Sequence, residues 1–229
     1  IPSLEKPQNG RRIAIGDIHG CIATFKALWE QLKVKKEDQI FLLGDLINTG
    51  KASKEVVDYT MSLINEGFKV IVIRGNHEQA FLHQYKKGMD AFQAYLGKNN
   101  SGEFLNSNEL DTYIEFFRQL EYCYDLGDWL VCHSHFSMNG KKEGRSMKRI
   151  FPKVTFDLGD LSISEKNQIV GHTPTKIKQI KKQLCKQKQI VCIDSGCVYN
   201  KEEGMGFLTA FDLDTHKLTF QENISITSK

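Results

Sequence analysis

Short apolar runs rich in β-branched residues recur along the chain and alternate, in its first third, with helical patterns. Strand-like runs occupy residues 12–15, 39–43 and 69–73. Between them, residues 22–33 and 53–66 place apolar side chains every three or four positions, the spacing of one face of an amphipathic helix. Strands joined through a helix at this spacing lie side by side in parallel, because the crossover returns the chain to the same end of the sheet. The pattern therefore predicts a parallel sheet in the first third.

Strand patterns without helices fill the last third of the chain. Residues 206–212 and 217–221 read as two strands of a β-hairpin that turns at residues 214–216. A parallel half joined to an antiparallel half predicts an α/β (α+β) fold, in which two sheets form a β-sandwich flanked by helices. Residues 176–189 carry six lysines and no acidic residue. They read as a solvated hairpin or loop, with a docking surface for an acidic partner as the alternative.

The length and composition of the chain fit one globular unit. With 229 residues, of which 40% are hydrophobic and 26% charged, we expect a single domain over residues 1–229. Within it, residues 109–120 read as a third helix. Residues 88–108 are rich in Gly, Asn and Ser and read as an inserted loop or lid.

Charge, hydropathy and cysteine usage narrow the environment and the partners. The net charge of +3 is too small to indicate nucleic-acid binding. The longest apolar runs are four or five residues, far short of the roughly 20 needed to span a bilayer. The six cysteines form no CxxC pair and no zinc-finger spacing, which favours reduced thiols. We expect a cytoplasmic monomer that binds neither nucleic acid nor membrane.

Polar side chains able to bind metals follow five of the strand patterns. They are Asp17 and His19, Asp45, Asn76 with His77, His133, and His172. The carboxyl ends of strands in α/β sheets face the crevice where ligands bind. Carboxylate, imidazole and amide groups that converge there suit hard-to-borderline divalent ions. A single polar group of this kind after a strand more often belongs to a turn. Five of them, each after a strand, are hard to explain by turns alone.

Six motifs together resemble one known family. They are "GDIHG" (16–20), "GDLINTG" (44–50), "RGNHE" (74–78), "CH" (132–133), "GHTP" (171–174) and "IDSGCV" (193–198). In order and spacing they resemble the calcineurin-like metallophosphoesterases. The similarity is greatest to the serine/threonine phosphoprotein phosphatases of bacteria and of phage lambda. It runs from about residue 12 to residue 212, nearly the whole chain.

The resemblance implies a metal-dependent phosphomonoesterase with two divalent ions. By it, Asp17 and His19 hold the first metal, Asp45 bridges both, and Asn76, His133 and His172 hold the second. Mn²⁺ is the expected ion, with Fe, Zn, Ni or Mg as alternatives. Two ions roughly 3.5–4 Å apart stabilise the attacking and leaving oxygens of an in-line displacement and acidify a water that attacks the phosphate. Glycines precede four of the ligands, where a side chain would crowd the metals.

The resemblance also assigns roles to the remaining residues of "RGNHE". His77 would donate a proton to the leaving group, and an ordinary histidine pKa suits a general acid near neutral pH. Arg74 would grip the phosphate, because its planar fork of donors matches phosphate oxygens.

The second motif departs from the family's usual GDxVDRG at two positions. Asn48 stands where an aspartate normally accepts a hydrogen bond from the catalytic histidine. Its carbonyl can still accept but adds no charge, which predicts a less readily protonated His77 and a slower enzyme. Thr49 replaces a phosphate-binding arginine. Arg149 in "SMKRIF" (146–151) resembles the position of another family arginine, with Arg145 as a fallback and a plain surface role as the alternative for either.

Three readings of function remain open at this stage. The first is a serine/threonine protein phosphatase acting on phosphorylated proteins or small phosphate esters. The second is a symmetrical bis(5'-nucleosyl)-tetraphosphate hydrolase, whose family also lacks the second aspartate of GDxVDRG. Glu78 favours the phosphatase, because those hydrolases usually have aspartate after GNH. The third is a metal-binding regulatory module that has lost turnover.

His135 lies two residues after His133, and its side chain could also reach the pocket.

Overall fold

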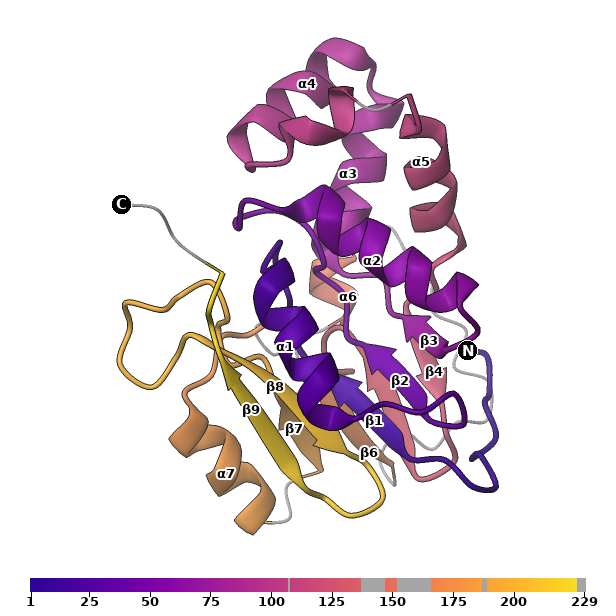
Figure 1. Ribbon diagram of the computed structural model, residues 1–229, viewed down its shortest axis with the longest axis vertical. Helices are drawn as coiled ribbons and strands as arrows, with labels where there is room; N and C mark the ends of the chain where they lie inside the picture. The colour runs from indigo at the N-terminus through magenta and orange to yellow at the C-terminus, as the bar shows by residue number, and fades with distance from the viewer. Residues whose placement is uncertain (107, 137–146, 152–165, 187–188, 226–229) are drawn as a thin grey trace.

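Two β-sheets packed face to face form the centre of the molecule in the computed structural model, which describes residues 1–106, 108–136, 147–151, 166–186 and 189–225 (Figure 1). The first sheet has the strand order β3-β2-β1-β8-β9 and the second β4-β5-β6-β7. The strands are β1 (Arg12–Ile15), β2 (Gln39–Leu42), β3 (Lys69–Val72), β4 (Cys123–Asp125), β5 (Trp129–Cys132), β6 (Asn167–Val170), β7 (Ile190–Cys192), β8 (Phe207–Asp212) and β9 (Leu218–Glu222). The expected sandwich flanked by helices is confirmed.

The helices lie outside the sheets and at one end of the sandwich. They are α1 (Ile22–Leu32), α2 (Ser53–Asn65), α3 (Asn76–Lys86), α4 (Met89–Lys98), the 3-10 helix η1 (Gly102–Asn106), α5 (Leu110–Gln119), α6 (Met147–Ile150) and α7 (Ile177–Cys185). The helices in the described part of the chain are all too short or too polar to span a lipid bilayer.

Strand direction follows the predicted pattern in the first sheet. Strands β1, β2 and β3 pair in parallel, and β8 and β9 form the expected antiparallel hairpin. The second sheet differs from the expectation, because β5, β6 and β7 are also parallel and only β4 is antiparallel. Helix α7 supplies the crossover between β6 and β7. The solvated hairpin or loop expected for the lysine-rich residues 176–189 is therefore wrong for most of that segment.

Alternation of side chains along the strands separates the layers of the core. In β1, Ile13 and Ile15 pack with α1 and α2, whereas Ala14 between them faces the second sheet. In β5, Trp129 and Val131 face the first sheet and Leu130 faces outward. Successive residues of a strand point to opposite faces, so each sheet has a helix-covered face and an inter-sheet face.

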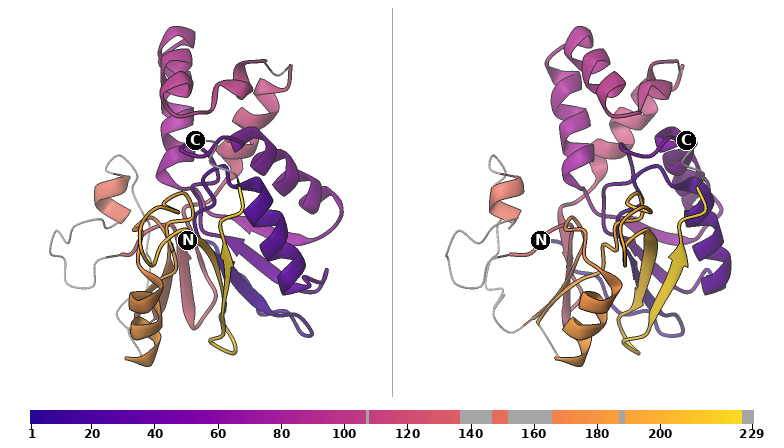
Figure 2. Two further views of the ribbon diagram at one scale, coloured as in Figure 1. Left: turned by 60° about the vertical axis from the view of Figure 1, so that its left-hand side comes forward. Right: turned by 90° about the vertical axis from the view of Figure 1, so that its left-hand side faces the viewer.

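The segment predicted as an inserted loop or lid is largely helical. Helices α3, α4 and α5 stack at one end of the sandwich (Figures 1 and 2). Phe81 of α3 lies edge-on to Phe92 of α4, Phe104 of η1 and Phe117 of α5, with ring centroids 4.8, 5.1 and 5.0 Å away. These aromatic contacts hold the inserted segment to α3, which begins within the "RGNHE" motif.

Candidate active site

Loops that follow the parallel strands of both sheets bring the sequence-predicted ligands to one end of the sandwich. Asp17 and His19 follow β1, Asp45 follows β2, Asn76 and His77 begin α3, His133 follows β5, and His172 follows β6. The two sheets meet directly there, because the backbone N–H of His172 donates to both oxygens of Asp17, 155 residues away, at 3.1 and 2.9 Å. The carboxyl ends of the strands thus form a shared crevice.

Asp45 lies between two groups of possible ligand atoms. One group is His19, Asp45 and His77, and the other is Asp45, His133 and His172; within each group the ligand atoms lie within 4.8 Å of one another. The Asp45 Oδ2 atom is 3.4 Å from His133 Nε2 and 3.8 Å from the Nε2 atoms of His19 and His77. A carboxylate with two oxygens in this central place can serve both groups.

Asn76 joins the second group through His133. Its Oδ1 atom is 2.9 Å from His133 Nε2, which is 3.1 Å from His172 Nδ1. The other nitrogen of His133 contacts the Leu43 carbonyl at 2.8 Å, which fixes the ring and leaves Nε2 facing the crevice. Asn76, His133 and His172 thus bring one oxygen and two nitrogen donor atoms together.

The ligand positions have unusual backbone conformations. His19, Asp45 and His172 have φ values of 47°, 50° and 67°, a left-handed region that costs energy for residues other than glycine. The glycines before Asn76 and His172 have a steric role, since a Cβ on Gly75 would clash with the Asp45 carboxylate and one on Gly171 with the Asp17 carboxylate. The two glycines thus allow the backbone to approach the Asp17 and Asp45 carboxylates closely.

Three aspartates are buried at this end of the molecule. They are Asp17, Asp45 and Asp194, each at most 3% exposed. Burial, followed by the charges of Asp194 and Asp45, raises the pKa of Asp17 well above its usual value, and burial likewise raises the pKa of Asp194. Burial would also raise the pKa of Asp45, but His133 and His77 outweigh it and lower that pKa below its usual range.

Cations fit this cluster. Within the described ranges, no lysine or arginine side chain forms an ion pair with Asp17, Asp45 or Asp194. Buried charges are stable when they are paired or coordinate metals. Carboxylate, imidazole and amide donors in one crevice match divalent ions such as Mn²⁺. The donor set therefore fits a metal centre, whose six proposed ligands are the residues predicted from sequence.

Sequence reasoning gave no role to Asp194, although it quoted the "IDSGCV" motif. Asp194 follows β7 as the other acidic residues follow β1 and β2, so its place after a strand was the available signal. Its Oδ1 atom accepts the Gly196 backbone N–H at 2.8 Å. This bond turns the carboxylate toward its own loop while leaving it close enough to raise the pKa of Asp17.

Glu78 has a structural role. Its Oε2 atom accepts the backbone N–H groups of Asp45 and Gly75 at 3.0 and 2.9 Å, and Oε1 accepts that of Leu46 at 2.8 Å. The residue is fully buried. Glu78 thus ties the loop after β2 to the start of α3, and so ties Asp45 to Asn76.

His77 belongs to the first group of possible ligand atoms and contacts Asp45, which both groups share. Its backbone N–H donates to Asp45 Oδ1 at 3.0 Å, and its ring stands edge-on to that of His19 with centroids 4.9 Å apart. Asn48 contacts the ring at 2.7 Å, but through its Nδ2 atom to His77 Nδ1. This differs from the expected carbonyl contact, because the Asn48 carbonyl is occupied by Ser101.

Arg74 contacts protein groups at the outer side of the site. Its guanidinium donates to the Arg118 carbonyl at 2.6 Å and to the Tyr122 hydroxyl at 3.1 Å, and it lies over the Tyr122 ring at 4.8 Å. Its buried Nε atom has no hydrogen-bond partner among the residues that the structure describes. Phosphate binding by Arg74 stays a prediction. The side chain of Arg149 and the whole of Arg145 lie outside the described residues.

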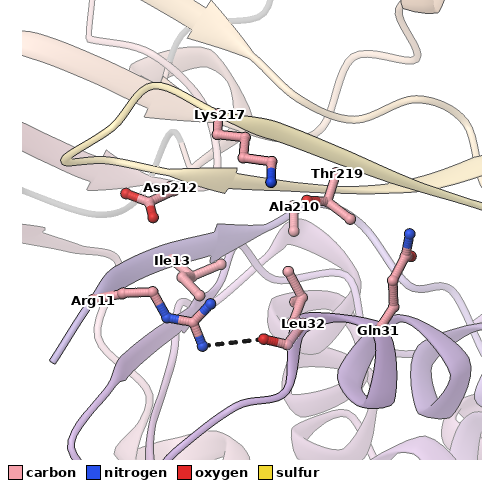
Figure 3. A pocket seen from close by; sticks show the side chains of 8 residues that line it. All are labelled: Arg11, Ile13, Gln31, Leu32, Ala210, Asp212, Lys217 and Thr219. Atoms are coloured by element: carbon pink, nitrogen blue, oxygen red, sulfur yellow. Dashed lines mark hydrogen bonds between the residues drawn. The ribbon is translucent and has the colours of Figure 1, made fainter.

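Two cavities differ in their relation to the site. A pocket of about 490 Å³ is lined by residues that neighbour two ligands in the sequence, among them Ser134, Gly171 and Thr173, but by none of the six proposed ligands. His135 lines this pocket and belongs to neither group of ligand atoms. A smaller pocket of about 110 Å³ lies at the opposite end of β1, where Arg11 donates to the Leu32 carbonyl (Figure 3).

Comparisons with known proteins agree on one family. A family model described as calcineurin-like phosphoesterase matches residues 10–215. A symmetrical bis(5'-nucleosyl)-tetraphosphatase of Buchnera aphidicola subsp. Acyrthosiphon pisum (strain Tuc7) is 28% identical over 130 residues, which cover 56% of this chain and 40% of that protein. The enzyme of the same name from Hamiltonella defensa is 34% identical over 110 residues, 46% of this chain and 36% of that protein. The chain thus matches about two fifths of the length of these relatives.

Solved structures show the same fold at low identity. A candidate diadenosine tetraphosphatase has a TM-score of 0.65 at 21% identity and covers 96% of each chain. A Saccharomyces cerevisiae serine/threonine phosphatase similar to human phosphatase PP5 has a TM-score of 0.63 at 14% identity, covering all of this chain and 85% of that one.

Proposed function

We propose a specific reaction for this chain from the premise that it belongs to the calcineurin-like phosphoesterase family. The reaction is metal-dependent hydrolysis of a phosphoric ester or anhydride. Asp17, His19, Asp45, Asn76, His133 and His172 would hold two divalent ions. When bound, such ions supply charge stabilisation for the transferred phosphoryl group and a more acidic water.

The chain's own residues orient and protonate the substrate. His77 presents Nε2 on the Asp45 side of the crevice, 3.8 Å from Oδ2, where it can pass a proton to the departing oxygen. Glu78 keeps Asp45 and Asn76 in register through its three backbone hydrogen bonds. Arg74 would bind phosphate after exchanging its present protein contacts.

We further propose that the substrate is a symmetrical bis(5'-nucleosyl) tetraphosphate, which is cut at its centre to give two nucleoside diphosphates. The relatives named as symmetrical tetraphosphatases, matched over 110–130 residues, are the observation that carries this choice.

In the sequence, a protein phosphatase is favoured by the resemblance of the motifs and by the identity of Glu78. The Glu78 carboxylate is fully buried and accepts backbone N–H groups of two loops, so its role in this chain is structural. The relatives named as symmetrical tetraphosphatases favour the substrate first given as the alternative.

Side-by-side turnover tests the proposal. Purified chain with Mn²⁺ is given diadenosine tetraphosphate, a phosphoserine peptide or p-nitrophenyl phosphate, and products are separated by anion-exchange chromatography. We expect ADP as the sole nucleotide product and the highest kcat/KM for the dinucleotide. Faster release of phosphate from the peptide would favour the protein phosphatase. AMP with ATP would exclude central cleavage.

A catalytically dead control completes the assay. Asp45→Asn removes one charge from the shared ligand and should abolish turnover of all three substrates. If wild-type chain takes up Mn²⁺ by calorimetry but turns over none of them, the regulatory-module reading replaces the enzyme.

A further inference from the structure

The inserted helical segment contacts the site through Asn48. This side chain is fully buried and its backbone is left-handed, with φ of 72°. Ser101, just before η1, donates its hydroxyl to Asn48 Oδ1 at 2.7 Å. On the other side, Asn48 Nδ2 lies 2.7 Å from both the Tyr95 hydroxyl of α4 and His77 Nδ1. The amide therefore links the insertion to the His77 ring.

The hydrogen-bond network fixes which way the amide points. As placed, both Nδ2 hydrogens have acceptors, one on Tyr95 and one on His77, and Oδ1 accepts from Ser101. The Tyr95 hydroxyl hydrogen remains available for the His77 carbonyl, 3.2 Å away. Every polar group of the amide is then paired.

The reversed amide would be less favourable. Oδ1 would face His77 and Tyr95, and Nδ2 would face the Ser101 hydroxyl, which can accept only one of its two hydrogens in this arrangement. Ser101 could then donate to Ser53, 3.0 Å away, so the number of bonds is unchanged. One buried N–H would nevertheless be left without an acceptor among the contacts of the described residues, which disfavours the reversed form by about tenfold or more.

We propose that Asn48 is a positioning residue that holds the neutral His77 ring with its hydrogen on Nε2, and that the Tyr95 hydroxyl, as the second acceptor for Nδ2, keeps the amide in this orientation. An amide N–H that donates to Nδ1 requires Nδ1 to be the unprotonated nitrogen, so the hydrogen resides on Nε2. Nε2 is the atom on the Asp45 side of the crevice. The insertion thereby sets which ring nitrogen offers a hydrogen to the site.

An aspartate at position 48 would have the opposite effect. A carboxylate only accepts, so it would draw the hydrogen to His77 Nδ1 and leave Nε2 without one. The substitution Asn48→Asp is therefore a reversal of the proposed device as well as a change in charge. The proposal concerns the site of the proposed hydrolase, yet it is tested on the ring itself and needs no turnover.

Nitrogen NMR of the histidine rings tests the proposal in metal-free protein. The protein is labelled with ¹⁵N-histidine, and spectra are recorded at increasing pH until the ring nitrogen shifts no longer change, so that the neutral ring is observed. A His77→Gln spectrum assigns the ring. We expect the unprotonated shift at Nδ1 and the protonated shift at Nε2 in the wild type, and the reverse in Asn48→Asp.

Variants of the two hydroxyl groups test how the amide is held. Tyr95→Phe removes one of the two acceptors of Nδ2, so that either orientation of the amide leaves one N–H unpaired. It should lower the ratio of the Nε2–H to the Nδ1–H form about tenfold, whereas Ser101→Ala removes a hydroxyl that can donate or accept and should leave the Nε2–H form in excess. Tyr85→Phe is the matched control, since it removes a tyrosine hydroxyl from α3 and keeps the ring that contacts Phe92. The proposal is overturned if wild-type His77 carries its hydrogen on Nδ1, or if Tyr95→Phe leaves the ratio within twofold. If Tyr95→Phe fails to fold, the wild type and Asn48→Asp still decide.

Discussion

Glu78→Gln tests whether one buried carboxylate keeps two ligand loops in register. Glu78 accepts three backbone N–H groups, those of Asp45 and Gly75 at Oε2 and that of Leu46 at Oε1. Glutamine has nearly the same shape but only one acceptor atom. If its oxygen takes the place of Oε2, its amide nitrogen meets the Leu46 N–H, donor against donor.

The expected cost follows from these contacts. One buried N–H loses its acceptor, at about 1–3 kcal/mol, and two bonds to a charged acceptor become bonds to a neutral one, at about 1 kcal/mol together. Burial raises the pKa of Glu78, so removal of its charge offsets part of this cost. We expect a net loss of about 2–3 kcal/mol in the free energy of unfolding, or a fall in Tm of about 4–12 °C for a chain of this size.

Urea unfolding of metal-free protein measures this loss, and calorimetry with Mn²⁺ measures its effect on the ligands. Mn²⁺ affinity should fall at the same time, because the Asp45 loop loses its tie to the loop of Asn76. Glu115→Gln is the matched control. Its side chain is 59% exposed, and its unfolding free energy should change by less than about 0.5 kcal/mol. The clamp is refuted if Glu78→Gln unfolds like this control and binds Mn²⁺ like the wild type.

Three further outcomes are expected. Gly171→Ala should weaken Mn²⁺ binding about tenfold or more by calorimetry, because its Cβ would clash with the Asp17 carboxylate; unchanged affinity would mean that the loop moves freely. His77→Gln should lower kcat while Mn²⁺ affinity stays near that of the wild type, and a parallel loss of both would make His77 a ligand. Asp38→Asn should cost about 1.5–3 kcal/mol in urea unfolding, because Asp38 accepts from the Arg11 guanidinium and backbone. Burial opposes it, but these bonds lower the pKa of Asp38, so its contribution is present above the ordinary value of ~3.9 and is lost as pH falls through the lower folded value; a variant as acid-sensitive as the wild type would contradict this.

Local sequence patterns predicted those parts of the fold in which residues close in sequence pack against the same layer. Apolar runs rich in β-branched residues and the three- to four-residue spacing in α1 and α2 predicted the first sheet and its covering helices. Helix α4 was missed because only Phe92 and Leu96 of its ten residues are buried, and it lies in a segment rich in Gly and Asn. Phe92 of this helix packs against Phe81 of α3. Phe81 lies outside residues 88–108, so the sequence pattern of that segment does not reveal the contact.

The candidate ligands were predictable because they directly follow parallel strands, and parallel strands share one carboxyl edge. The orientation of polar side chains was not, because it depends on partners far away in sequence. From the sequence, Glu78 is a marker of substrate class. In the structure, its carboxylate accepts backbone N–H groups of residues 32 and 33 positions earlier. The guanidinium of Arg74 likewise depends on Tyr122 and Arg118, which belong to another part of the chain.

The orientation of the Asn48 amide depends in the same way on distant residues, those of the inserted segment. The two oxygens of an aspartate are equivalent, so an aspartate beside a histidine needs no help to present an acceptor. The two ends of an asparagine amide differ, and its surroundings must tell them apart. They do so by number: two acceptors, the Tyr95 hydroxyl and His77 Nδ1, face the nitrogen, whereas the Ser101 hydroxyl alone faces the oxygen. The replacement of a charged residue in this motif therefore has a defined chemical effect on His77 only where a second acceptor such as Tyr95 lies beside the amide.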